Sequence, residues 1–519
     1  MKKIIHLMFY ICIANVMWSQ ELHVAAGGEI TVDPGEVIYV DNNVSVDAGA
    51  TVTIKSDASK SASLMITGNS TGNITYKRYI PDSNWHLVSS PFTGQSIPSF
   101  VGDVGNAINK SVATDNYAVA YYKNDNTATK RWTYHNEVST VDENKETLTN
   151  FNSGFGYSVN RTSAGDFTFT GTLETEDVQV SIPISSSGTH LWSCIGNPYP
   201  SFLPANDNAN FTANVLKNNI SKLDPSFAHL YVWNGTAYVP IGHTDAALQL
   251  APGQAFMVNA KSNSETFTFS ESLQNHNEDV ATFHKNSNDI PTLSLNLSNG
   301  TQNKSTKIKF LKNATYGLDV GYDAGTYKDG THSFSLDTHL VANSQGIDFT
   351  IQCLPTDALQ NEVIIPLSVN TTANKELTFS VSTSNLETGL NVYLEDSVNN
   401  TLTNLTESSY QLTLKESLKG IGRFYLRTSS NSLSVEEGSF KNALNVYKTS
   451  ENTLRITGLD LQSRAFITIH NITGSEVFNK QFVAQRIQDI TLPRKLAAGV
   501  YMASIISNKT KYTKKLLIE

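Results

Sequence analysis

The feature that most constrains the fold is the alternation of apolar and polar residues over short spans. Leu293–Leu297 reads Leu-Ser-Leu-Asn-Leu, and Phe167–Thr170 and Phe267–Ser270 alternate in the same way. A period of two places the apolar side chains on one face of a strand. Before the C-terminal region, no window keeps apolar spacings of three and four over a dozen residues, so long helices are not expected. The predicted fold class is all-β and multidomain, because the length allows about three to five domains.

Two stretches of the chain carry the same short motifs in the same order. Four pairs of segments match, at offsets of 107, about 110, 99 and 100 residues: Trp85–Phe92 with Leu191–Tyr199, Ala120–Tyr134 with Leu230–Tyr238, Ser153–Val159 with Pro252–Val258, and Asp166–Phe169 with Glu265–Phe269. Ordered matches at one period predict tandem copies of one β module, at residues 76–175 and 176–280. The unit resembles uncharacterised β modules of flavobacterial secreted proteins, and this resemblance implies no activity.

The stretch before the first module, residues 21–75, repeats a shorter unit. An Asp-x-Gly turn in Val32–Gly35 precedes a β run, and a second turn in Val46–Gly49 does the same, with the two glycines fourteen residues apart. Turns and short strands at a fixed spacing predict two or three rungs of a β-solenoid-like stub. Such a stub cannot bury its faces alone, so we expect it to stack on the next domain. A pair of ordinary hairpins is the alternative.

Residues 290–430 contain strand-length apolar runs that suit a β-sandwich, among them Glu362–Leu367 and Leu377–Val381. The order of these runs resembles a β-sandwich that precedes sorting domains in flavobacterial proteins, again without known chemistry. Residues 431–439 include Glu436–Gly438 and read as a linker.

Residues 440–519 have the most specific family resemblance in the chain. The motifs that carry it are Asn445–Tyr447, Ala465–Ile469, Gly499–Tyr501 and Lys514–Glu519. The stretch resembles the type A C-terminal sorting domain of proteins exported by the type IX secretion system of Bacteroidetes. The resemblance implies an Ig-like β-sandwich, the secretion machinery as a partner, and export across the outer membrane, followed by removal of the tail and surface attachment or release. The residues that match the sorting signal are Gly499, Tyr501, Lys515, Leu516 and Ile518.

The N-terminal residues have the pattern of a secretion signal, which agrees with the export predicted from the C-terminal residues. Lys2 and Lys3 precede the short apolar stretch Ile4–Trp18, and Ser19 and Gln20 end it. This pattern is typical of a secretory signal peptide, residues 1–20, cleaved near residue 20. No later apolar run is long enough for a transmembrane helix. The predicted location is therefore extracellular or on the outer cell surface, reached through the periplasm.

Charge and cysteine content narrow the range of partners. The formal net charge is −9, while residues 439–519 carry +7 and residues 21–438 carry −18. An acidic passenger argues against nucleic acid or anionic lipid as a partner, because both need a basic footprint. After the signal, only Cys194 and Cys353 are present, so a single disulfide and two buried thiols both remain open.

The search for catalytic and metal-binding motifs finds little. Gly-x-Ser-x-Gly, His-Glu-x-x-His, Cys-x-x-Cys and a phosphate-binding loop are all absent from the sequence, so we expect no enzyme. A glycoside hydrolase needs only two facing carboxylates, which sequence cannot locate. No cofactor is predicted, although Asp319, Asp323 and Asp329, interleaved with glycines, suggest a calcium loop. Ordinary turns explain these acids more simply.

Aromatic residues are the best remaining indication of a binding site. They cluster on the expected hairpin of each module, at Tyr121, Trp132, Tyr134, Tyr231, Trp233 and Tyr238. Exposed, they would form a stacking platform for sugar rings. Buried, they would belong to the core, and alternation allows only one face of a strand to be buried. The core interpretation is favoured because Trp and Tyr are usually largely buried.

Three functions are consistent with these patterns. A non-catalytic surface protein for adhesion or scaffolding, with a surface protein as partner, is favoured because the chain is modular and lacks catalytic motifs. A polysaccharide-binding protein is the alternative, and it requires the aromatic hairpins to be exposed. A hydrolase of an unrecognised family is third, because sites on β scaffolds need leave no motif in the sequence.

Overall fold

The computed structural model describes residues 17–19, 21–138, 144–188, 190–276, 290–329, 333–386, 389–429, 444–450, 452–459, 464–485, 487–493, 495–497, 499–507 and 510–518. The chain divides into two compact units, Met1–Ser287 and Asn288–Glu519, and each is described by itself. The predicted linker, residues 431–439, and all of the predicted signal peptide except residues 17–19 lie outside the described residues.

Strands dominate both units, which confirms the predicted all-β class. The α-helices are short: α1 (Ile97–Gly102) and α2 (Val215–Asn219) have six and five residues. Single 3-10 turns lie at Val104–Asn106, Ala128–Lys130, Ile220–Lys222, Pro225–Phe227, Glu271–Leu273 and Thr356–Leu359. Within the described ranges, no helix has the length and apolar character needed to span a membrane.

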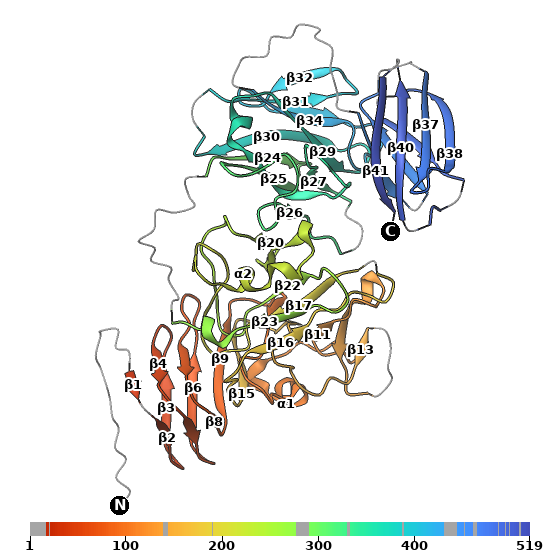
Figure 1. Ribbon diagram of the computed structural model, residues 1–519. Helices are drawn as coiled ribbons and strands as arrows, with labels where there is room; N and C mark the ends of the chain where they lie inside the picture. The colour runs from red at the N-terminus through yellow and green to blue at the C-terminus, as the bar shows by residue number, and fades with distance from the viewer. Residues whose placement is uncertain are drawn as a thin grey trace, which may run out of the picture. The chain divides into compact units, whose positions relative to one another are not determined.

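The N-terminal stub consists of three columns of parallel strands (Figure 1). The columns are β1 (Met17–Ser19), β4 (Val37–Val40) and β7 (Ser63–Ile66); β2 (Leu22–Val24), β5 (Val44–Val46) and β8 (Ser70–Thr71); and β3 (Glu29–Val32), β6 (Thr51–Lys55) and β9 (Ile74–Ile80). Alternate residues such as Val40, Val44 and Ile54 are buried. Hairpins pair their strands antiparallel, so the parallel pairing identifies solenoid rungs and excludes the hairpin alternative.

The stub shares its core with the first repeat. Strand β9 pairs antiparallel with β15 (Gly165–Gly171), which extends the third column. Ile54 and Tyr76 from the stub belong to one buried cluster with Phe100, Phe167 and Phe169 from the repeat. The third rung therefore continues into the first repeat, and the two parts share one core.

The two repeats contain sheets with the same order of strands. In the first repeat the order is β10 (His86–Val88), β14 (Tyr157–Val159), β11 (Val119–Tyr122), β12 (Trp132–His135) and β13 (Lys145–Glu146). In the second it is β17 (Trp192–Gly196), β22 (Ala255–Asn259), β19 (Leu230–Trp233) and β20 (Tyr238–Ile241). Two strand pairs complete the second repeat: β16 (Val178–Ser181) with β23 (Thr266–Phe269), and β18 (Leu203–Pro204) with β21 (Gln249–Leu250).

The repeats join through a pair of reciprocal contacts. Phe155, just before β14, forms an antiparallel bridge with Ile195 in β17, and Gln254, just before β22, forms one with Val88 in β10. The motif offsets make Phe155 equivalent to Gln254, and Val88 equivalent to Ile195. Each repeat therefore gives the other the same contact, as the subunits of an isologous dimer do.

Glycine permits the close approach at this junction. A Cβ atom at Gly156 would lie 2.5 Å from Cys194 Sγ and 2.9 Å from the Cβ of Ala255. On the other side, a Cβ atom at Gly196 would lie 2.6 Å from the Cβ of Ser89. The main chains of the two repeats lie within hydrogen-bonding distance here. A side chain at Gly156 or Gly196 would therefore force the repeats apart.

The second unit begins with one sheet of eleven strands. Its order is β32 (Thr401–Asn404), β31 (Asn391–Asp396), β34 (Phe424–Ser429), β29 (Val363–Asn370), β27 (Ser335–Thr338), β28 (Phe349–Pro355), β25 (Asn303–Leu311), β24 (Thr292–Ser298), β30 (Glu376–Ser384) and β33 (Tyr410–Thr413), with β26 (Ala324–Gly325) beside β28. Strands far apart in this order, such as β31 and β30, contribute Leu394 and Phe379 to one core. The predicted sandwich is thus a continuous sheet wrapped around its core, which we call the wrapped sheet.

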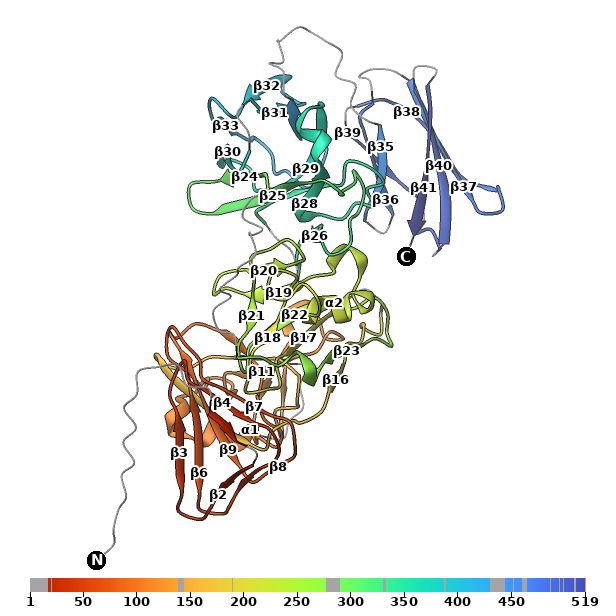
Figure 2. The ribbon, with the colours of Figure 1, turned by 60° about the vertical axis from the view of Figure 1, so that its left-hand side comes forward.

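The chain ends in a two-sheet sandwich, residues 444–518, which we call the C-terminal sandwich (Figure 2). One sheet has the order β35 (Asn445–Ser450), β36 (Thr453–Thr457), β39 (Ile487–Thr491). The other has the order β38 (Glu476–Val483), β37 (Arg464–Asn471), β40 (Gly499–Ser507), β41 (Thr510–Ile518). Apolar residues from both sheets, including Ile456 and Ile467, form one core.

Replacing Gly156 with Val should destabilise the first unit, because the new side chain would overlap Cys194 and Ala255 at the repeat junction. Overpacking of this kind costs about 1–3 kcal/mol. Urea unfolding followed by tryptophan fluorescence measures the effect. Gly102→Ala is the matched control, because nothing lies within 4 Å of a Cβ atom there. Equal losses of stability in the two variants would contradict the importance of the junction.

Candidate functional site

The sheet of the first repeat has one core face and one outer face. Val88, Val119 and Val159 point into the buried core. The register places Ala120 opposite Tyr134 and Ser158, so these residues and their neighbours at i±2 lie on the outer face. The outer face thus combines large aromatic rings with small side chains, of which Ala120 is fully buried.

A groove of about 420 Å³ lies on this outer face. Trp85, Tyr117 and Tyr134 are the aromatic residues that line it, together with Ala118. Tyr117 also packs against the core and against the His135 ring. The remaining lining is polar, with the side chains of Asn109, Lys110, Ser111, Thr114, Asn116 and Asn160. Aromatic walls with a few amide and hydroxyl groups are typical of a small-molecule or sugar site.

Contacts with neighbouring side chains hold the aromatic walls in place. The Trp85 and Tyr134 rings pack edge to face with their centroids 5.9 Å apart. Lys110 Nζ lies 4.5 Å from the centroid of the Tyr117 ring, and the hydrogen bond between these two side chains raises the pKa of Lys110. Burial raises the pKa of Tyr134, so its hydroxyl stays protonated and remains a hydrogen-bond donor. Trp85 keeps 39% of its surface exposed.

Amide side chains build the polar part of the groove. Asn136 Nδ2 donates to Asn116 Oδ1 at 2.8 Å and to the Thr114 carbonyl at 3.0 Å. Asn109 Nδ2 donates to Asn160 Oδ1, and Asn160 Nδ2 donates to the Ser83 carbonyl. These bonds hold the side chains of Asn109, Asn116 and Asn160 in place before any ligand arrives.

The equivalent place in the second repeat is filled. Pairing within the two sheets makes Ala120 equivalent to Tyr231, because Ala120 lies opposite Ser158 and Tyr231 lies opposite the equivalent Met257. Trp192, the counterpart of Trp85, is only 4% exposed, and its ring centroid is 4.8 Å from that of Tyr231. Phe227 closes the other side of Trp192, with centroids 5.6 Å apart. Ala120, at the place of Tyr231, offers Trp85 no such ring, so Trp85 lacks the packing that buries Trp192.

An aromatic row leads from the groove toward the second repeat. The Trp233 indole N–H donates to the Trp85 carbonyl at 3.0 Å, across the boundary between the repeats. The Trp233 ring lies 5.0 Å from that of Tyr238, its cross-strand neighbour. Both rings are half-buried. Together with Tyr134 and Trp85, they form a partly exposed row that we call the aromatic row.

The six aromatic residues predicted from sequence separate into three groups. Tyr134, Trp233 and Tyr238 lie in the aromatic row, and Trp132 is half-buried on the same outer face as Tyr134. Tyr121 is on the opposite face of β11 and packs against the core. The inclusion of Tyr231 in a platform is wrong, because its side chain is fully buried under Trp192.

Sequence reasoning missed Trp85 and Tyr117 as parts of the site. Trp85 stood out only as part of the repeated motif, and its distance from the hairpin along the chain hid its contact with Tyr134. The signal that could have located the groove is the pair Ala118 and Ala120, at positions where the second repeat has His229 and Tyr231.

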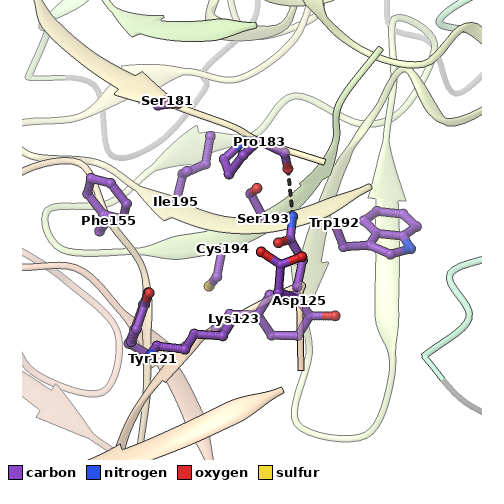
Figure 3. Close-up of a pocket in the computed structure, with 12 residues that line it drawn as sticks. Tyr121, Lys123, Asp125, Phe155, Ser181, Pro183, Trp192, Ser193, Cys194 and Ile195 are labelled. Carbon is purple, nitrogen blue, oxygen red and sulfur yellow. Dashed lines mark hydrogen bonds between the residues drawn. The ribbon is translucent and has the colours of Figure 1, made fainter. Parts of the chain in front are cut away.

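A second cavity, of about 320 Å³, lies between the repeats (Figure 3). Tyr121, Lys123, Asp125, Trp192 and Cys194 are among the residues that line it. Lys123 pairs with Glu146, and the Asp125 carboxylate accepts the Ser186 N–H, so its charged groups already have protein partners. Burial raises the pKa of the Cys194 thiol, which makes it an unreactive group.

The three aspartates of the suggested calcium loop do not form a common ligand set. Asp323 accepts the backbone N–H groups of Asp319 and Cys353 at 2.6 Å each, and Asp319 accepts the N–H of Thr315 at 2.7 Å. Asp329 follows after β26 and is half-buried. In the part of the chain that the structure describes, no three His, Cys, Asp or Glu side chains are grouped to hold a metal ion. Cys194 and Cys353 are both buried, and no disulfide joins them.

The sorting-signal residues lie together in the last hairpin. In the pairing of β40 with β41, Gly499 is opposite Ile518, and Tyr501 is opposite Leu516. Tyr501, Leu516 and Ile518 belong to the core of the C-terminal sandwich. Lys515 points away from that core and is exposed. The hydroxyl of Tyr501 donates to the Ala497 carbonyl at 2.9 Å.

Comparison with known proteins identifies both parts of the chain. Residues 8–427 match the family described as "Domain of unknown function (DUF8693)". Residues 449–519 match the "Secretion system C-terminal sorting domain". No curated protein matches the chain. Among solved structures, a two-domain fibronectin type III segment of chicken tenascin is 12% identical and covers 30% of this chain and 98% of its own, with a TM-score of 0.12 that is too low to support a shared fold.

Asp323 should make the second unit less stable as the pH rises. Burial raises the pKa of this carboxyl to about 7, from an ordinary value of 3.8. The folded state therefore holds the proton more tightly, and stability should fall between about pH 4 and pH 7, by up to about 4 kcal/mol.

The Asp323→Asn variant, which cannot ionise, should show a smaller change in the free energy of unfolding over this interval. Urea unfolding of the two proteins at several pH values gives the comparison. Asp337, whose pKa is raised to about 6, is present in both and contributes a common background. Identical slopes for the two proteins would exclude Asp323 as a source of the pH dependence.

Proposed function

We propose that this chain, which belongs to the family described as domain of unknown function DUF8693, is a non-catalytic surface protein that adheres to glycans through the groove of its first repeat. Its C-terminal sandwich is a sorting domain of the type IX secretion system, which implies export to the cell surface or the extracellular space. A glycan is therefore a ligand that the exported chain would meet.

The observation that carries the proposal is the open groove beneath Trp85. Two copies of one module share a strand order, yet the second packs Trp192 against Tyr231 and Phe227, while in the first the equivalent Trp85 lines a groove together with Ala118. Filling the space would bury more apolar surface and stabilise the fold. A half-exposed tryptophan beside an unfilled groove is thus costly for stability, and a bound ligand would offset that cost.

The lining of the groove suits a neutral sugar. Flat aromatic faces can pack against the C–H face of a sugar ring, and the amides of Asn109, Asn116 and Asn160 can bond to its hydroxyls. The one cation of the lining, Lys110, lies 3.8 Å from the carboxylate of Asp115. This partial neutralisation makes an acidic glycan a weaker candidate.

The same lining supports binding rather than hydrolysis. Glycoside hydrolases place two carboxyl groups about 5–10 Å apart across the scissile bond. The described residues that line the groove include no Asp or Glu. Glu137, beside the groove, already accepts a hydrogen bond from the Tyr117 hydroxyl at 3.2 Å. The aromatic row and the amide groups can therefore hold a sugar chain, and the described lining offers no pair of carboxyl groups.

Substitutions in the groove should abolish retention on glycans. Trp85→Ala and Tyr134→Ala should each weaken binding at least about tenfold, because buried aromatic contacts dominate binding energies. Ala118→His, which copies His229 of the second repeat, should block the groove without removing a contact. The measurement is affinity electrophoresis or pull-down of residues 21–435 on a panel of neutral polysaccharides.

Phe211→Ala is the matched control, because this aromatic side chain is 77% exposed and belongs to a different loop. It should bind as the unmodified protein does. Retention that survives all three groove substitutions, or that Phe211→Ala removes equally, would count against the groove.

Removing residues 440–519 should leave the passenger in the periplasm, because the sorting domain would be lost. Cell fractionation and protease shaving of intact cells distinguish periplasmic from surface protein. Removing residues 21–75 instead should not redirect the protein, although it would expose the core of the first repeat. Surface display of the protein without residues 440–519 would contradict the sorting role.

A further inference from the structure

The three-stranded sheet of the C-terminal sandwich carries a polar row on its outer face. Tyr447 lies opposite Arg455, and Arg455 lies opposite Asp489, so the three side chains follow one line across β35, β36 and β39. Their sequence neighbours Val446 and Leu454 point into the core of this domain. Because side chains alternate between the two faces of a strand, the three residues of this row would be expected to be exposed to solvent.

Tyr447 is nevertheless buried. It is 6% exposed although it points away from the core of its own domain. Its ring lies 5.9 Å from that of His339, between centroids, and a Cβ atom at Gly346 would lie 3.5 Å from its ring. Both neighbours belong to the loop after β27 in the wrapped sheet. This loop, residues 339–346, therefore covers the tyrosine.

Two cations reach backbone carbonyl groups of the wrapped sheet. Arg455 donates through Nη1 to the Lys419 carbonyl at 2.9 Å, while its Nε and Nη2 bind Asp489 at 2.7 and 2.8 Å. Lys514, from β41, donates to the Ser344 carbonyl at 2.6 Å. Together with Tyr447, these residues contact the wrapped sheet at two separate loops.

Contacts within the wrapped sheet hold the receiving loop. His339 is 3% exposed, and its Nε2 lies 2.7 Å from Asp348 Oδ1. Asp348 also pairs with Lys328, which fixes the carboxylate from the other side. Gly346 adopts a left-handed conformation, with φ of 84°, that favours glycine.

The second sheet of the C-terminal sandwich has a different outer face. Phe466 and Ile506 are cross-strand neighbours, and each is 44% exposed. Met502, two pairs further along β40, is 39% exposed and lies opposite the exposed Lys515. One outer face of the domain is therefore covered by the wrapped sheet at Tyr447 and Arg455, and the other is open.

We propose that the wrapped sheet is a specific docking surface for the sorting domain of the same chain, so that only the Phe466 face of that domain is free for other partners. The determinants of sorting then extend beyond residues 449–519. They include Tyr447, which precedes the matched segment, and the loop 339–346 of the passenger. The sorting domain would be presented by its passenger in one orientation.

The first test cuts the connection between the two domains. A protease site is inserted between Glu437 and Gly438, outside the described residues, in the full chain from residue 21. After cleavage, the pieces should stay together on gel filtration at micromolar concentration. Tyr447→Ala and Arg455→Ala should each weaken the complex at least about tenfold. Phe466→Ala, an aromatic truncation on the open face, should not. Separation of the unsubstituted pieces would overturn the proposal.

The second test does not depend on loss of binding. A Cβ atom at Gly346 would lie 3.6 Å from the Cβ of Tyr447, which is within the range of about 3.5–4.5 Å found in disulfides. Gly346→Cys with Tyr447→Cys should therefore link the cleaved pieces on a non-reducing gel. Gly346→Cys with Phe466→Cys carries the same change at Gly346 and should not. No link in the first pair, or equal linking in both, would refute the docking.

Discussion

The reciprocal contact between the two repeats is the constraint on which the first unit depends. Two equivalent bridges, Phe155 with Ile195 and Gln254 with Val88, join main chain to main chain. Val88 ends β10, and Trp85 directly precedes that strand, so the junction also fixes where the groove wall stands. Since Trp233 donates to the Trp85 carbonyl across the same boundary, the aromatic row exists only while the repeats are joined.

Duplication allows the two repeats to divide stability and binding between them. The second repeat buries Trp192 against Tyr231 and Phe227, and fully burying an aromatic side chain is worth about 1.5–3 kcal/mol. The first repeat gives up this packing at Ala118 and Ala120 and keeps Trp85 accessible. The well-packed second repeat can thus stabilise the first repeat, whose open groove lowers its own stability. Functional sites in proteins commonly reduce stability in this way.

Sequence patterns predicted the architecture better than the site. Alternation and ordered motifs sufficed to predict the all-β class, because apolar residues recur at every second position of a strand that has one buried face. They could not tell which face of a strand is outermost: Tyr231 and Trp233 share a face, yet one is buried and the other lies in the aromatic row. Tyr447 shows the same limit, since its burial comes from a loop about a hundred residues earlier. The carboxylates of Asp319 and Asp323 were similarly ambiguous until their backbone partners were seen.

The measurement that tests the central claim most directly is hydroxyl-radical footprinting of the full chain with soluble neutral glycans. Trp85, Tyr117 and Tyr134 should lose reactivity together in the presence of at least one glycan, because they wall one groove. Phe211, exposed on another loop, should react as before. Protection of Phe211 to the same extent, or unchanged reactivity of the three groove residues with every glycan, would contradict glycan binding at this groove.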